Sequence, residues 1–129
     1  MRMKIERPTT LVLGASLKTY RYSHQAILRL HLSAVPTYAF GLKTGRVGDV
    51  TIQTSIEEFV DSSIHTFSLY LGPDRQTDLL QWVKMIKPQR IIFNPGTENP
   101  SIYHALAKEG VQCEEACTLV LLASNQYGV

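Results

Sequence analysis

The chain has 129 residues, of which 44% are hydrophobic and 19% charged, and its formal net charge at pH 7 is +2. This length and composition predict one globular domain over residues 1–129 and argue against a strongly basic nucleic-acid-binding surface. The apolar runs are too short for a signal peptide or a membrane-spanning helix. Two cysteines, Cys113 and Cys117, are too few for a disulfide framework, so we expect reduced thiols and a cytoplasmic location.

The first predicted strand, Thr9–Leu13, carries no charge and stops at a glycine. The loop after it contains Lys18 and Arg21, and a helical pattern opens at Ser23. A buried parallel strand that leads through a turn of small residues to a helix N-terminus is typical of phosphate-binding sites. We therefore expect the loop to bind an anion at its first residues, which are Gly14, Ala15 and Ser16.

This loop departs from the dinucleotide-binding turn, which needs three glycines at fixed spacing. Here only Gly14 is a glycine, and Ser16 and Thr19 stand where the second and third glycines of that motif would be. Because the helix also opens late, we expect a wider loop, whose backbone amides and Ser16 hydroxyl can still receive an anion. A tight strand-to-helix turn that binds nothing is the alternative.

The rest of the chain alternates apolar runs with helical patterns, which indicates a parallel sheet with helices on its faces. We predict four further strands, which are Val35–Phe40, Ile64–Leu71, Arg90–Asn94 and Val111–Glu114. We interpret Val50–Gln53 as a short extra segment. The predicted helices are Ser23–Ser33, Thr54–Val60 with a capping box of Thr54 and Glu57, Asp74–Ile86, Pro100–Gly110 capped by Asn99, and Cys117–Ser124.

The predicted fold class is α/β, a three-layer, Rossmann-like, doubly wound sheet of five parallel strands with helices on both faces. In the usual order of such a sheet, the first strand and Arg90–Asn94 are neighbours at the topological switch point. The loops that follow these two strands would then share the crevice where open sheets bind ligands.

The end of the second strand helps to distinguish between ligands. An NAD-binding domain would place an acidic residue there, about 20 residues past the glycines, to bind the ribose hydroxyls. This chain has Phe40-Gly41-Leu42-Lys43 instead, with Arg46 beyond. A lysine at this place suits a phosphate on the ribose, as in coenzyme A or NADP, although a solvated loop lysine is equally compatible with the pattern.

Two further loops could contact a ligand. At Tyr70-Leu71-Gly72-Pro73, Leu71 and Gly72 could lay an apolar wall and exposed backbone against a purine, or the strand could simply end in a turn. At Asn94-Pro95-Gly96-Thr97, the rigid Pro95 and permissive Gly96 fix the shape of the backbone, and Asn94 supplies a donor and an acceptor.

The sequence assigns no catalytic residue and no metal ligand. The four histidines are dispersed, and none has metal-ligand spacing to a cysteine or to a second histidine. His24, in the first turn of a helix near the phosphate loop, is the one histidine worth following. Cys117 is interpreted as a small buried residue rather than a nucleophile, and Glu115 as a solvated acid rather than a base.

Several segments together resemble the stand-alone CoA-binding proteins, small Rossmann-like domains similar to the N-terminal domain of the succinyl-CoA synthetase alpha subunit. The likeness covers nearly the whole chain, and the matching segments are Gly14-Ala15-Ser16, Arg21 with Ser23, Phe93-Asn94-Pro95-Gly96-Thr97-Glu98-Asn99-Pro100 and Glu115-Ala116-Cys117-Thr118-Leu119-Val120. One departure is the pair Phe40-Gly41, where family members usually have Asn-Pro.

The resemblance implies that CoA or an acyl-CoA binds at the carboxyl ends of the strands. The first loop would hold the pyrophosphate, and a lysine after the second strand, Lys43 here, would meet a phosphate near the adenosine. The turn at Leu71 and Gly72 would pack against the nucleotide, and the Asn94 loop would line the pantetheine exit. The chain ends before the domain that supplies the phosphohistidine of the synthetase, so the resemblance implies binding without that chemistry.

Three functions are compatible with the sequence. The leading hypothesis is non-catalytic binding of CoA or an acyl-CoA by a carrier, sensor or regulatory module. The alternatives are a small enzyme that acts on a CoA thioester, with His24 or Glu115 as acid or base, and a regulatory protein that binds NADP or another nucleotide. We expect a small-molecule ligand without nucleic acid or membrane, and leave a homodimer or an unidentified protein partner open.

Overall fold

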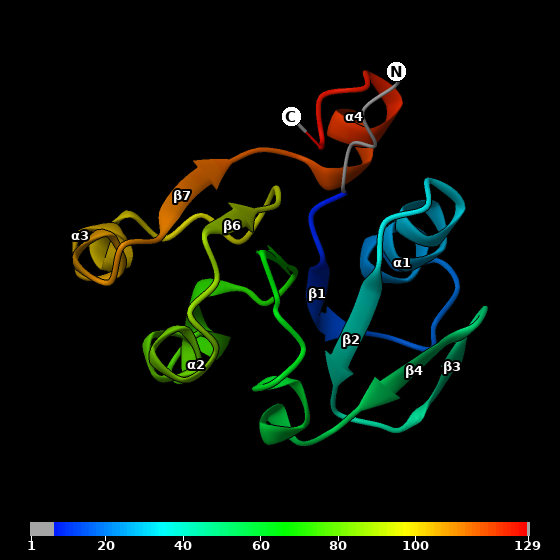
Figure 1. Ribbon diagram of the computed structural model, residues 1–129, viewed down its shortest axis with the longest axis horizontal. Helices are drawn as coiled ribbons and strands as arrows, with labels where there is room; N and C mark the ends of the chain where they lie inside the picture. Colours follow the sequence, from blue (N-terminus) through cyan, green and yellow to red (C-terminus); the bar gives the residue numbers. More distant parts are fainter. Residues whose placement is uncertain (1–6, 129) are drawn as a thin grey trace, which may run out of the picture.

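The computed structural model describes residues 7–128, which form one seven-stranded sheet in the order β3-β4-β2-β1-β5-β6-β7 (Figure 1). Every neighbouring pair is parallel except β3 and β4, which are antiparallel. The strands are β1 (Thr10–Ala15), β2 (Thr37–Gly41), β3 (Gly45–Val47), β4 (Val50–Gln53), β5 (Thr66–Leu69), β6 (Arg90–Phe93) and β7 (Gln112–Glu115).

Helices cover both faces of the sheet, which makes three layers (Figure 1). The α-helices are α1 (Tyr22–Leu32), α2 (Leu79–Ile86), α3 (Pro100–Lys108) and α4 (Thr118–Ala123), and the short 3₁₀ helices are η1 (Ile56–Phe59) and η2 (Pro73–Arg75). The helices α1 and α4 pack on one face, whereas α2, α3 and η1 pack on the other. The predicted α/β, doubly wound class is confirmed.

The central strands are apolar on both sides because each side is covered by helices. In β1, Leu11 and Leu13 join the core under α2 and α3, whereas Val12 joins the core under α1. Successive side chains of a strand point to opposite faces, so the uncharged run in the sequence fills two cores at once.

The predicted number of strands was wrong, because the segment after Gly41 forms a hairpin of two strands. The segment Val50–Gln53 pairs in parallel with β2, with Ala39 opposite Ile52, and β3 returns along its outer side. A turn at Gly48, with φ of +59°, joins the two strands. The sheet therefore has seven strands, of which one is antiparallel.

The predicted contact between the first strand and Arg90–Asn94 was also wrong. The strand β1 lies between β2 and β5, and β6 is one place further out. The error follows from the uncounted strand β4, because the six parallel strands together have the usual doubly wound order. The switch point is therefore between β1 and β5, and the chain after Leu69 faces the first loop.

Two helix starts differ from the predictions by more than one residue. The stretch Asp74–Ile86 divides into η2 and α2, with Gln76 to Asp78 between them. The predicted capping box at Thr54 is wrong, because the N-cap residue of η1 is Ser55, which makes no capping hydrogen bond. The Ser55 hydroxyl instead donates a 2.6 Å hydrogen bond to the Glu57 carboxylate. Asn99 does stand at the N-cap of α3, with Pro100 in the first turn, but its side chain makes no capping hydrogen bond.

The end of the described chain is anchored in the amino-terminal edge of the sheet. Tyr127 is 1% exposed, and its hydroxyl lies 2.6 Å from that of Thr10. The guanidinium of Arg90 lies 4.7 Å from the centre of the Tyr127 ring and donates from Nε to Thr66. Burial raises the pKa of Tyr127 to about 12, so the phenol is neutral at physiological pH. Among residues 7–128, no helix is long and apolar enough to cross a bilayer.

Replacement of Tyr127 tests this anchor. Tyr127→Ala should lower the free energy of unfolding by about 3–5 kcal/mol, because it leaves a cavity and removes the aromatic face beside Arg90. Tyr127→Phe should cost only about 1 kcal/mol, since it removes one hydrogen bond. Urea unfolding measures both, and an unchanged midpoint for the alanine variant would contradict the anchor.

Candidate functional site

The end of β1 requires a glycine for two reasons. Gly14 has φ of +92°, and a Cβ atom there would lie 3.1 Å from the carbonyl group of Tyr70. The pairing of β1 with β2 is irregular at the same place, between Leu13 and Ala15. The bulge and the left-handed residue turn the chain away from the sheet, so Ala15 and Ser16 begin the loop that leads to α1.

The end of β2 approaches the same turn even more closely. Gly41 pairs with Ala15, and a Cβ atom on Gly41 would lie 2.5 Å from the Ala15 carbonyl oxygen. No side chain fits in this space. This close contact explains why a glycine stands at position 41, since only a residue without a side chain lets β2 lie this near the first loop.

The helix α1 begins without a side-chain cap. Its N-cap residue is Arg21, which makes no capping hydrogen bond, and its first turn contains no acidic residue. The first N–H groups of a helix have no partner within it, and its dipole favours negative charge there. The N-terminus of α1 is therefore suited to receive an anion.

Side chains around this N-terminus hold the loop in shape. The imidazole of His24 donates from Nδ1 to the Ser16 carbonyl at 2.9 Å, and the Ser16 hydroxyl accepts from the Lys18 N–H at 3.1 Å. His24 and Ser23 are buried, whereas Lys18 and Arg21 are exposed. The guanidinium of Arg21 lies 5.6 Å from the centre of the Tyr20 ring. Both cations are thus exposed at the loop surface, while His24 supports the backbone.

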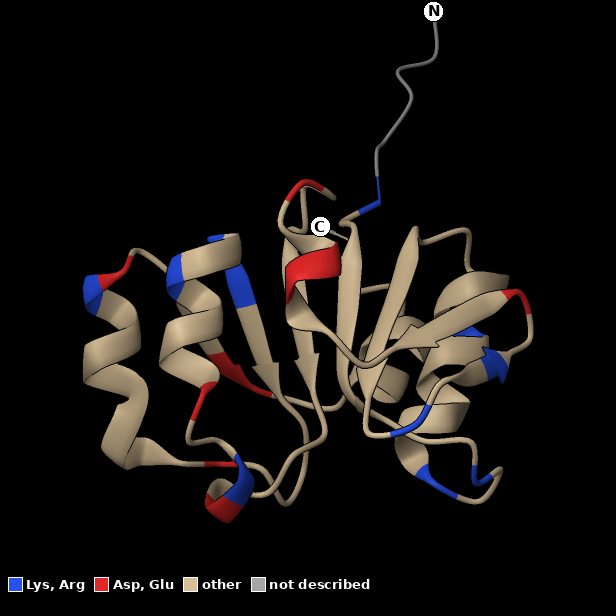
Figure 2. Cartoon of the chain, turned by 90° about the horizontal axis from the view of Figure 1, so that it is seen from below, with Lys and Arg blue, Asp and Glu red and all other residues tan. Residues whose placement is uncertain are grey.

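The carboxyl edge of the sheet is basic on the side of α1. Lys43 is exposed in the loop between β2 and β3, and Lys18 and Arg21 lie in the loop before α1. Figure 2 shows basic segments gathered in the loops at the lower right, whereas acidic and basic segments are mixed at the lower left. Arg46 is engaged elsewhere, 3.7 Å from the Asp49 carboxylate.

The buried side chain of Asn94 ties three elements together below the second loop. Its Nδ2 donates to the Ser68 hydroxyl at 3.1 Å and to the Leu69 carbonyl at 3.0 Å, and its Oδ1 accepts from the Thr118 N–H at 2.8 Å. The residue is fully buried. What the structure shows for Asn94 is a positioning role, and a direct contact with a ligand stays a prediction.

The loop after Asn94 is closed by its own hydrogen bonds. Thr97 donates from both its backbone N–H and its hydroxyl to the Asn94 carbonyl, at 2.9 and 2.8 Å. Pro95 and Gly96 are exposed at the tip, and the Gly96 N–H is taken by the Glu98 carboxylate at 2.8 Å. Gly96 has φ of +93°, which favours glycine.

Sequence reasoning missed Gln76, a buried residue that joins this loop to the turn after β5. Its Nε2 donates to the carbonyls of Leu71 and Thr97, both at 2.8 Å. The missed signal was a polar residue in line with the apolar stripe of α2, three residues before Leu79 and seven before Val83.

The turn after β5 presents a mixed surface. Leu71 and Gly72 are partly exposed, and Tyr70 before them is largely buried. The Tyr70 hydroxyl has no hydrogen-bond partner within residues 7–128. Burial raises the pKa of Tyr70 far above its usual value, an effect that the neighbouring Thr118 hydroxyl opposes.

The remaining ionisable candidates take part in structural contacts. Glu115 accepts a 2.8 Å hydrogen bond from the Tyr103 hydroxyl, which itself accepts from the Asn99 N–H at 3.0 Å. Cys113 is half-buried, and burial raises the pKa of its thiol. Cys117 is also half-buried, at the N-cap of α4. In the described part of the chain, no three His, Cys, Asp or Glu side chains group as metal ligands.

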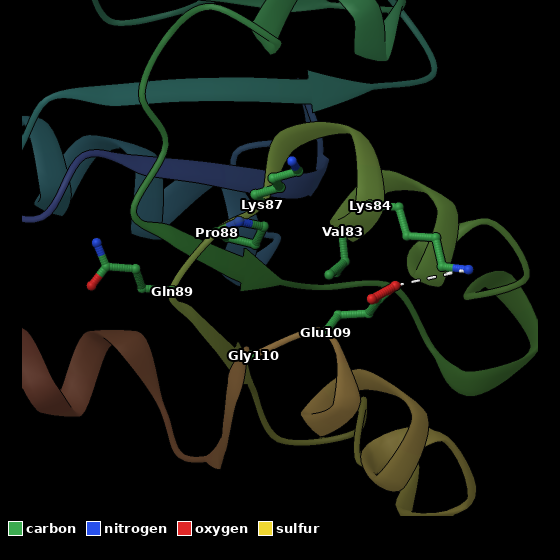
Figure 3. A pocket seen from close by; sticks show the side chains of 7 residues that line it. All are labelled: Val83, Lys84, Lys87, Pro88, Gln89, Glu109 and Gly110. Atoms are coloured by element: carbon green, nitrogen blue, oxygen red, sulfur yellow. Dashed lines mark ion pairs between the residues drawn. The ribbon is translucent and has the colours of Figure 1, made fainter.

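A depression of about 300 Å³ lies at the opposite edge of the sheet (Figure 3). It is lined by the C-terminal ends of α2 and α3 and includes the 3.8 Å ion pair of Lys84 with Glu109. Helix C-termini carry partial negative charge and disfavour anions. Lys84 and Lys87 also line the depression, but its lining includes no helix N-terminus with free N–H groups such as α1 offers at the carboxyl edge.

Comparison with known proteins identifies the family and the fold. A family model described as a CoA binding domain matches residues 8–123. A solved structure of a protein described as uncharacterized is 32% identical, with a TM-score of 0.83, and the match covers 94% of this chain and 98% of that one. No curated protein matches the chain.

Two more distant structures share the fold. A hypothetical protein from Pyrococcus horikoshii OT3 is 16% identical with a TM-score of 0.82, covering 95% of this chain and 85% of that one. A protein from Thermus thermophilus is 17% identical, also with a TM-score of 0.82, and covers 94% and 91% respectively.

The close approach of β2 to the first loop predicts the effect of a single methyl group. Gly41→Ala should destabilise the protein by about 1–3 kcal/mol, because the Ala15 carbonyl must move. Gly72→Ala is the matched control, since Gly72 has φ of −64° and its Cβ would meet only the carboxylate of the exposed Asp74, at 3.1 Å. If both variants unfold at the same urea concentration as the wild type, the proposed contact is wrong.

Proposed function

Because the chain belongs to the CoA-binding domain family, whose model matches residues 8–123, we propose that it binds coenzyme A or an acyl-CoA along the carboxyl edge of its sheet. The binding is non-catalytic, and the protein acts in the cytoplasm as a carrier, sensor or regulatory module. The uncapped N-terminus of α1, with Lys18 and Arg21 beside it and no acid in its first turn, is the observation that carries this proposal.

The pyrophosphate of CoA is placed at this N-terminus. Its negative charge matches the free N–H groups of the first turn and the two exposed cations. Gly14 and Gly41 support this placement, because each lets a neighbouring strand approach the loop without a side chain in between. The backbone at Ala15 and Ser16 then lies next to the phosphates.

The other parts of the ligand follow from the order of the loops. Lys43, in the loop after β2, meets the phosphate on the ribose, and Leu71 with Gly72 packs against the nucleotide. The loop from Asn94 through Pro95 to Gly96 lines the path of the pantetheine arm. Pro95 and Gly96 are exposed there, as a surface that contacts the arm requires.

Features of the same site argue against the two alternative functions. An enzyme acting on a CoA thioester would need an acid or base, and His24 and Glu115 both have structural hydrogen bonds, to Ser16 and from Tyr103. A regulatory protein that binds NADP would also use Lys43 for a ribose phosphate. The first loop of this chain, however, lacks the second and third glycines of a dinucleotide-binding turn, so CoA is favoured over NADP.

The binding of CoA should depend on Arg21. At a CoA concentration of one hundred times the dissociation constant, the wild type should gain about 2.7 kcal/mol of stability, whereas NAD should add little. Arg21→Gln should weaken CoA binding about tenfold, because it removes a charged contact with a phosphate. Unfolding with and without ligand measures the stabilisation, and isothermal titration calorimetry measures the dissociation constants.

Arg29→Gln is the control for that substitution, because Arg29 is exposed in the last turn of the same helix. Its dissociation constant for CoA should equal that of the wild type. Absence of a thermal shift with millimolar CoA, together with a shift from NADP, would overturn the proposal in favour of the nucleotide alternative.

Lys43 should distinguish CoA from dephospho-CoA, which lacks the phosphate on the ribose. The wild type should prefer CoA by about tenfold, and Lys43→Met should reduce this preference to about twofold or less without weakening dephospho-CoA binding. Lys108→Met, at the exposed end of α3, should leave the preference unchanged. Equal preference in wild type and Lys43→Met would exclude the predicted role of Lys43.

A further inference from the structure

The side chain of Gln76 spans the two loops that our proposal places along the ligand. Its Nε2 donates one hydrogen to the Leu71 carbonyl and the other to the Thr97 carbonyl, both at 2.8 Å, and its Oε1 accepts from Asn99 Nδ2 at 3.0 Å. The residue is 5% exposed. Both donors are therefore used inside the protein, and Gln76 has none to offer a ligand.

These hydrogen bonds complete a closed circuit between β5 and β6. Asn94 bonds to the Leu69 carbonyl, Thr97 bonds to the Asn94 carbonyl, and Gln76 bonds to Thr97 and back to Leu71. The two loops are thus joined at two levels, once by Asn94 at the end of the strands and once by Gln76 beyond them. Two separate joints fix both the distance and the relative orientation of the loops.

The backbone holds Gln76 in place for this task. It closes η2, where its N–H donates to the Pro73 carbonyl at 3.3 Å, and its own carbonyl accepts from the Leu79 N–H at 3.0 Å. The residue therefore sits at the junction of η2 and α2. A shift of the Leu71 loop relative to the Thr97 loop would therefore break at least one hydrogen bond of the Gln76 side chain.

We infer that Gln76 is a positioning residue that sets the spacing between the nucleotide half and the pantetheine half of the CoA site. This inference rests on the proposed function. Leu71 and Gly72 pack against the nucleotide, and Asn94 to Gly96 line the pantetheine arm. A ligand that spans both halves gains affinity from both only where their spacing matches its own. Gln76 thus serves the whole ligand without touching it.

The inference is tested by comparing CoA with 3′,5′-ADP, a fragment that occupies only the nucleotide half. Gln76→Met keeps the length of the side chain and removes all three hydrogen bonds. It should weaken CoA binding about tenfold and 3′,5′-ADP binding less than about twofold. Calorimetric titration at a temperature where each variant is folded gives both dissociation constants.

Two further variants complete the design. Gln81→Met is the control, because Gln81 is exposed on α2 and should leave both dissociation constants unchanged. Asn99→Ala removes the 3.0 Å bond to Gln76 Oε1 and keeps the other two, so it should shift the ratio of the two constants in the same direction, by about threefold. It carries the test if Gln76→Met does not fold.

The outcomes separate the two proposals. If the wild type binds CoA and the two substitutions weaken both ligands equally, or neither ligand, then Gln76 has only a general structural role and this inference is overturned. If the folded wild type does not bind CoA, the proposed function fails, and the inference fails with it. A selective loss of CoA affinity supports both.

Discussion

The buried amide of Asn94 is the interaction on which the arrangement of the carboxyl edge depends. One side chain holds the end of β5 through Ser68 and Leu69 and the start of α4 through Thr118, while its own backbone begins the loop after β6. A buried amide that lost these partners would leave unsatisfied groups on three elements. The Thr97 and Gln76 bonds then build outward from this point, so the exposed tip at Pro95 and Gly96 rests on a rigid base.

The other half of the carboxyl edge, around the loop after β1, depends on a different feature. There the backbones of neighbouring segments approach each other closely, because glycines leave no side chain between them. Gly14 and Gly41 bring β1, β2 and the chain after β5 together at the place where the first loop starts. Beyond them, the uncapped helix and the exposed Lys18 and Arg21 supply positive charge. The two halves are chemically distinct, with a cationic cradle on one side and an amide-supported loop on the other. Coenzyme A has the same division, between its phosphates and its pantetheine arm.

Much of this edge could be predicted from the sequence, because it depends on local patterns. The uncharged run before Gly14, the late start of α1 and the missing acid after β2 are all visible in a few consecutive residues. The hairpin was missed because β3 has only three residues, too few for a clear periodic signal, and without this partner Val50–Gln53 was interpreted as a short extra segment. The position of Gln76 in line with the apolar stripe of α2 indicates burial, but no sequence pattern shows which groups its amide reaches. Two of its three partners, Thr97 and Asn99, lie 21 and 23 residues further along the chain.

We propose that CoA lies along the carboxyl edge, with its pyrophosphate at the N-terminus of α1. Backbone amide chemical shifts, recorded by NMR during a CoA titration, would locate the ligand on the protein. We expect the largest shifts at Ser16 and at Tyr22 to His24, with further shifts at Lys43 and Gly96. Shifts concentrated at the depression between Lys84 and Gly110 on the opposite edge, or no saturable shifts at millimolar CoA, would contradict it.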